Sequence, residues 1–154
     1  MHHSGPREPA EAYPILREVI IEYGDNFADD ELGISMAYED QAELCMNDSK
    51  YDESWHWYQN ALARYRRVGC YTWMLIVSIG EMLKRKGDFE GSLKYFNMSL
   101  AQKWKLEPQN RVSIMPSMRN IADLGKTFHD YTMELHWYRK ALDLSWKRFV
   151  MNMI

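Results

Sequence analysis

The stretch HWYQNAL at residues 56–62 returns later in the chain as HWYRKAL at residues 136–142. Between them lies a third, more divergent version, SLKYFNMSL at residues 92–100. The aromatic residues that align in the three versions are Tyr58, Phe96 and Tyr138. Their spacing corresponds to a repeat of about 40 residues, which indicates a chain built from stacked, similar structural units.

Each unit is expected to contain two helices joined by a short turn. In the middle unit, apolar residues recur with a helical period over residues 71–85 and again over residues 89–104. Gly87 suits the left-handed position that ends the first helix, and Asp88 suits the N-cap of the second. The sequence therefore predicts a helical hairpin in this unit.

The same pattern extends over the rest of the chain. Further helices are predicted over residues 10–23, 34–46, 51–68, 113–127 and 131–150, and no stretch alternates with the period of a strand. About seven helices in antiparallel pairs indicate an all-α fold, a helical-repeat solenoid or α-α superhelix. Residues 1–9 are interpreted as a disordered lead or a cloning remnant, and residues 10–154 as a single domain of about three and a half units.

Composition narrows the class of protein. Hydrophobic residues make up 46% of the chain, which is enough for a folded core, and the net charge of -3 does not favour nucleic-acid binding. Cys45 and Cys70 do not form a disulfide framework, so a reducing, cytoplasmic setting is expected. No apolar run approaches the roughly 18 residues of a membrane-spanning helix.

The sequence offers little that would carry catalysis. His56 and His136 occupy equivalent positions of two repeats, which is typical of a packing role. No metal-binding spacing, phosphate-binding loop or nucleophile motif is found. We therefore expect no catalytic residue, no metal and no cofactor, although an all-α enzyme stays open as a less favoured alternative.

The repeat resembles the tetratricopeptide repeat (TPR) family. In that pattern, a small residue in the first helix is followed by a small residue and a large aromatic in the second helix. Small residues let neighbouring helices approach, and large residues fill the space that is left. The residues of this chain assigned to repeat packing are Tyr38, Ala42, Tyr58, Ala61, Gly80, Phe96, Ala122, Tyr138 and Ala141. The match covers about residues 34–148, but the units are longer than the family's usual length of about 34 and lack its terminal proline.

The resemblance implies a protein-interaction module, a scaffold or adaptor, whose first helices line a concave groove that binds a peptide or protein segment. The residues placed in that groove by register are Glu39, Glu43, Asn47, Val77, Glu81, Lys84, Arg85, Arg119, Asp123 and Lys126. Chaperone-binding members hold a terminal carboxylate with a lysine and an asparagine one turn apart. Here those two slots hold Glu39 with Glu43, Val77 with Glu81, and Arg119 with Asp123, so no carboxylate clamp of this type is expected. An acidic residue recurs at one slot, as Glu43, Glu81 and Asp123, which favours a partner segment with basic residues. A regulatory, peptide-sensing helical-repeat receptor domain is the alternative function.

The end of the chain, WKRFVMNMI at residues 146–154, is strongly apolar for a terminus. Helical arrays need a polar outer face on their terminal unit, because that unit otherwise exposes its packing side. Either the protein continues beyond Ile154, or this end is covered by a second chain or by its own tail folding back. We expect self-association, in its simplest form a twofold homodimer through the C-terminal helix.

Overall fold

The computed structural model describes residues 31–67, 69 and 71–153 of the chain. These residues form helices and turns, with no strand among them, which confirms the all-α prediction. The helices are α2 (Glu31–Asn47), α3 (Tyr51–Arg67), α4 (Trp73–Lys86), α5 (Phe89–Leu106), α6 (Arg111–Thr127) and α7 (Tyr131–Met153). The helix predicted over residues 10–23 lies outside the described residues.

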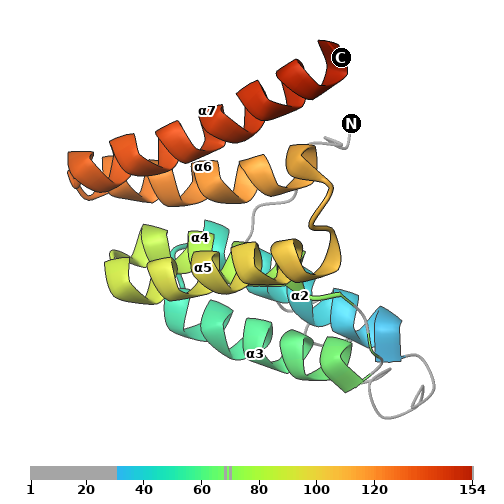
Figure 1. The fold of residues 1–154 in the computed structure, drawn as a ribbon. Helices are drawn as coiled ribbons and strands as arrows, with labels where there is room; N and C mark the ends of the chain where they lie inside the picture. The colour runs from blue at the N-terminus through green and yellow to red at the C-terminus, as the bar shows by residue number, and fades with distance from the viewer. Residues whose placement is uncertain (1–30, 68, 70, 154) are drawn as a thin grey trace, which may run out of the picture. The chain divides into compact units, whose positions relative to one another are not determined.

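Contacts divide the chain into two compact units, one that ends at Leu75 and one that begins at Ile76. In the first unit α2 and α3 pack against each other, and in the second α6 packs against both α5 and α7 (Figure 1). The assignment of residues 10–154 to a single domain stays a prediction.

The turn inside each helical hairpin has the same backbone conformation three times. Ser49, Gly87 and His129 are each in the left-handed region, with φ values of 59°, 91° and 61°. They follow one another at the spacing of the sequence repeat itself, so the turn recurs with the repeat. The amide that follows each of them donates to a carbonyl five residues earlier, as from Asp88 to Leu83 at 2.9 Å. This is the Schellman arrangement, which satisfies carbonyls at the end of a helix, and it confirms the predicted cap at Gly87.

Polar side chains cap the N-termini of the helices in the second unit. Asp88 accepts a hydrogen bond from the amide of Gly91 at 2.9 Å, and Asp130 accepts one from the amide of Met133 at 3.1 Å. Asn110 caps α6 through the amide of Ser113 at 3.1 Å. Each cap satisfies a backbone N–H that has no partner within its helix, so these residues fix where α5, α6 and α7 begin.

A serine joins the two helices of the hairpin in both units. The hydroxyl of Ser54 on α3 donates to the carbonyl of Ala42 on α2, and that of Ser92 on α5 donates to the carbonyl of Gly80 on α4, each at 2.8 Å. All four residues are buried. A buried helix carbonyl thus gains a second partner at the point where the two helices touch, and the repeat preserves this contact as well as the apolar pattern.

The residues assigned to repeat packing occupy two kinds of environment. Seven of the nine are buried: Ala42, Tyr58, Ala61, Gly80, Phe96, Ala122 and Ala141. Tyr38 is half-buried and stacks on Trp57, with ring centroids 5.4 Å apart. Tyr138 differs from its equivalents, because 36% of it is exposed, whereas Phe96 is 1% exposed. The reason is position: α5 is covered by α6, and no described helix of this unit covers the corresponding face of α7.

Candidate functional site

The groove residues predicted on α2 lie in the first unit. Glu43 and Asn47 are exposed, while Glu39 is half-buried. The carboxylate of Glu39 accepts a hydrogen bond from the hydroxyl of Tyr65 on α3 at 2.7 Å. Glu39 therefore links the two helices of its hairpin, and Glu43 is the predicted groove carboxylate on this helix that is exposed.

On α4, the predicted groove residues already have neighbours within the chain. Glu81 forms an ion pair with Lys84 at 3.1 Å, one turn along the same helix. Val77 is half-buried and packs against the hydrophobic core that contains Phe96. Arg85 is exposed. Val77 thus contributes to the core of the second unit, in addition to whatever surface it offers.

On α6, Arg119 and Lys126 are exposed and Asp123 is half-buried. The hydroxyl of Tyr138 on α7 donates a hydrogen bond to the carboxylate of Asp123. This carboxylate raises the pKa of Tyr138, because a phenol that donates to an anion loses that bond when it ionises. Two of the three recurring acidic residues, Glu81 and Asp123, are therefore bonded inside the chain, and Glu43 differs from them in being exposed.

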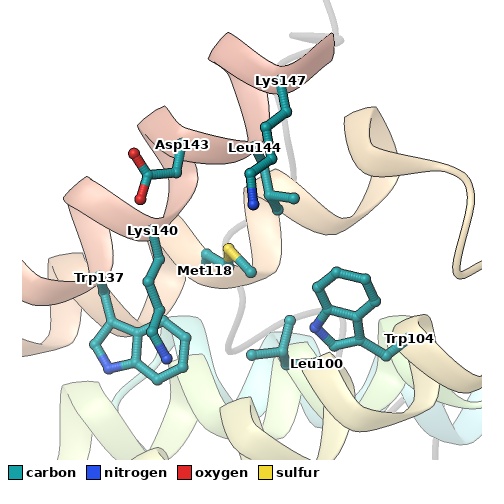
Figure 2. Close-up of a pocket in the computed structure, with 8 residues that line it drawn as sticks. All are labelled: Leu100, Trp104, Met118, Trp137, Lys140, Asp143, Leu144 and Lys147. Atoms are coloured by element: carbon teal, nitrogen blue, oxygen red, sulfur yellow. The ribbon is translucent and has the colours of Figure 1, made fainter. Parts of the chain in front are cut away.

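A separate cavity of about 370 Å³ opens where α5, α6 and α7 meet (Figure 2). Leu100 and Trp104 of α5 and Met118 of α6 form part of its lining. The remaining lining residues come from α7 and are Trp137, Lys140, Asp143, Leu144 and Lys147. Its volume is within the range of small-molecule and side-chain pockets, about 300 to 1,000 Å³. None of the ten predicted groove residues belongs to it.

The two lysines of this cavity lie beside its apolar lining, whereas its aspartate points away. The ammonium group of Lys140 lies 4.6 Å from the centre of the Trp137 ring, a cation–π contact that holds this lysine at the cavity. Figure 2 shows the Lys147 side chain extending along Leu144 toward the apolar lining, while the carboxylate of Asp143 points away from it. The cavity is thus apolar inside and positively charged on its α7 side.

The outer face of α7 is a second exposed apolar surface. Its exposed residues follow one another at intervals of three or four, which places them along one side of the helix. They are Tyr131, Leu135, Tyr138, Leu142, Trp146, Val150 and Met153. Leu142 is 68% exposed, whereas Leu100, at the equivalent place on α5, is 7% exposed. The position that receives the next helix on α5 is therefore open on α7.

The repeated histidines each contact a neighbouring aromatic ring. His56 and His136 are both exposed, and each meets the ring of the next residue, Trp57 or Trp137, edge-on at 5.4 and 5.7 Å between centroids. Among the residues that the structure describes, no group of three or more His, Cys, Asp or Glu side chains could hold a metal ion. Nor does any helix in the described part of the chain combine the length and apolar character needed to span a bilayer.

No protein-family model and no curated protein matches the sequence. Solved structures do match. The crystal structure of a putative kinesin light chain from Podosopora anserina, with nearly identical TPR-like repeats, superposes with a TM-score of 0.76 at 10% identity over 91% of this chain and 68% of that one. That of BtubC (BKLC) from P. vanneervenii gives a TM-score of 0.72 at 16% identity over 93% of this chain and 56% of that one. This chain has the TPR-like helical-repeat fold. It spans little more than half of the BtubC chain.

Within this TPR-like fold, sequence reasoning placed the binding surface on the first helices and missed the cavity beside the second helices. A signal for the cavity was present. Lys140, Leu144 and Lys147 follow one another at intervals of four and three residues, so an apolar residue lies between two cations on one helix face. Trp104 and Trp146 occupy equivalent positions of their repeats, yet only Trp104 reaches the cavity. The periodicity could not show which side of the helix would remain open.

Proposed function

We propose that the chain is a non-catalytic protein-interaction module. The observation that carries this proposal is the exposure of large apolar and aromatic side chains on α7, where Tyr131, Leu142 and Trp146 are each more than 60% exposed. Aromatic residues are enriched where proteins bind each other, and exposed apolar rows of this length mark interaction surfaces. The TPR-like fold supports the same proposal, because stacked hairpins offer long surfaces for partners.

The first helices supply the proposed groove for a peptide or protein segment. On α4 and α6 the proposed surface combines exposed cations, Arg85, Arg119 and Lys126, with the half-buried carboxylates of Glu81 and Asp123. Each of these carboxylates, and separately that of Glu43 on α2, favours basic residues in the partner. The internal bonds of Glu81 and Asp123 orient the carboxylates, and lower the gain expected from each of them.

A retention experiment from native lysate tests the groove. The variant Glu43→Gln, Glu81→Gln and Asp123→Asn removes the three negative charges but keeps an oxygen that accepts from Tyr138. The matched control removes three exposed carboxylates at the starts of second helices, as Asp52→Asn, Glu53→Gln and Glu90→Gln. We expect the groove variant to lose proteins that the wild type and the control both retain, as identified by mass spectrometry. Equal retention by all three proteins would move the interaction to another face.

We also propose a second copy of the chain as the partner of the open face of α7. An antiparallel pair of α7 helices centred on Leu142 would place Tyr138 of one copy beside Trp146 of the other, because each lies four residues from Leu142. Such a contact is self-complementary, as a twofold interface requires. It would cover the exposed apolar row of α7, which corresponds to the face of α5 that α6 covers.

A further inference from the structure

We propose that the cavity formed by α5, α6 and α7 is a second, independent binding site, which takes an amphipathic acidic helix from a partner protein. The proposal rests on the interaction function given above but uses residues that belong neither to the predicted groove nor to the open row on α7.

The shape of the lining favours a helix. The α7 residues of the cavity extend from Trp137 to Lys147, ten residue steps that rise about 15 Å along a helix axis. Leu100 and Trp104 run parallel to them for one turn of α5, and Met118 of α6 forms the floor (Figure 2). A space bounded by two helices and floored by a third is the kind of groove into which an amphipathic helix lays its apolar face.

The side chains at the cavity can anchor such a helix. Leu100 and Met118 are almost fully buried, while Trp104 is 38% exposed and so presents part of its indole ring to the space. The volume of about 370 Å³ suits one or two apolar side chains inserted from outside, and two neighbouring anchors are what one turn of a helix presents. Tryptophan in a partly enclosed site is the residue type that most often dominates the energy of an interface.

The charges select an acidic partner. Lys140 and Lys147 flank Leu144 and are two helical turns apart, and Asp143 points away from the apolar lining. A partner helix with two carboxylates seven residues apart and apolar residues between them would match this arrangement. The cation–π contact of Lys140 with Trp137 leaves the outer side of its ammonium group available to a carboxylate. The same charges disfavour a basic segment, whereas the recurring carboxylates of the proposed groove favour one, so the two sites select different partners.

The experiment titrates the full chain with three short labelled peptides. The first is a helical peptide with glutamates seven residues apart and leucines between them. The second has the same composition and helix content, with the glutamates moved off that spacing, and the third replaces the glutamates by lysines. We expect the first to bind at least about tenfold more tightly than the second. The third should leave the indole N–H signals of Trp104 and Trp137 unchanged, even if it binds in the groove. Indole N–H signals of Trp104 and Trp137, assigned by Trp→Phe variants, should shift on binding, while that of Trp146 on the open row should not.

The double variant Lys140→Glu with Lys147→Glu changes exposed side chains, so it should fold normally by circular dichroism. Its affinity for the acidic peptide should fall by about tenfold or more, and its affinity for the lysine peptide should rise. The matched control, Lys86→Glu with Lys94→Glu, makes the same change of charge away from the cavity and should bind like the wild type. Equal affinity for the first two peptides, an unchanged affinity in the cavity variant, or an equal loss in the control would each overturn the proposal. Because this titration uses defined peptides, its result is independent of whether the groove retains a partner from lysate.

Discussion

The backbone at Gly80 lies so close to Phe96 that a β-carbon added there would stand 2.7 Å from two carbons of the ring. Phe96 is 1% exposed and belongs to the hydrophobic core, so its ring has little room to move aside. An alanine gains about 1 kcal/mol over glycine in helix propensity, but overpacking a core costs about 1 to 3 kcal/mol. Gly80→Ala should therefore lower the free energy of unfolding slightly, and Gly80→Leu should lower it by several times as much.

Urea unfolding of a double-mutant cycle would identify the cause. Phe96→Leu alone should destabilise, because it removes part of a buried ring. Gly80→Ala should cost less, or even stabilise, when combined with Phe96→Leu, because the added methyl group then has space. Strictly additive effects of the two substitutions would contradict a direct contact between them.

Replacing Ser49 or His129 by glycine should stabilise the folded chain. Both have left-handed backbone conformations, which are strained for residues with a β-carbon, and Gly87 takes the same place in the middle unit. Ser49→Gly and His129→Gly should each raise the free energy of unfolding by about 0.5 to 1 kcal/mol, because the relief of strain exceeds the added flexibility of the unfolded chain. Lys86→Gly, one residue before the left-handed position, serves as the control and should destabilise.

The pKa of Tyr138 should fall when the charge of Asp123 is removed. In the native chain the hydrogen bond to this carboxylate raises the pKa of Tyr138, so the bond adds stability below the pKa of an unfolded tyrosine. That contribution is lost as the pH rises through the raised value in the folded state. Titration of the Tyr138 ring carbon by NMR should give a lower pKa in Asp123→Asn and an unchanged one in Asp143→Asn. Equal titration in all three proteins would show that the two side chains do not meet.

Sedimentation at micromolar concentration tests the proposed pairing of α7. We expect the wild type to form dimers and Leu142→Glu with Trp146→Glu to be monomeric, because two charges cannot be buried in an apolar contact without partners. Leu106→Glu with Val112→Glu also places two glutamates at exposed apolar positions, on α5 and α6, and should leave the dimer intact. A wild type that remains monomeric throughout would exclude the dimer and leave the open face to another protein.

Several features of the fold could be predicted because they depend on residues near each other in the chain. The repeat of Tyr58, Phe96 and Tyr138 located the second helices, and the Gly87-Asp88 pair located a turn, since capping is decided by the local backbone. The boundaries predicted for the described helices lie within a single helical turn of the observed ones. The largest differences are at the start of α2, which begins at Glu31 rather than at residue 34, and at the end of α7, which continues to Met153 rather than ending at residue 150.

An all-helical chain of repeated hairpins could be read from the amino acids alone, because helical period, turn chemistry and the spacing of small and large residues are properties of neighbouring positions. Which of the equivalent positions are covered became clear in the three-dimensional packing. Leu100 and Leu142 have the same place in their repeats, yet α6 buries the first and the second is open. The tertiary packing also decides the cavity between α5 and α7 and the hydrogen bond from Tyr138 to Asp123. Whether a residue is buried depends on which parts of the chain, distant in sequence, pack against it. A periodic pattern of neighbouring residues does not contain that information.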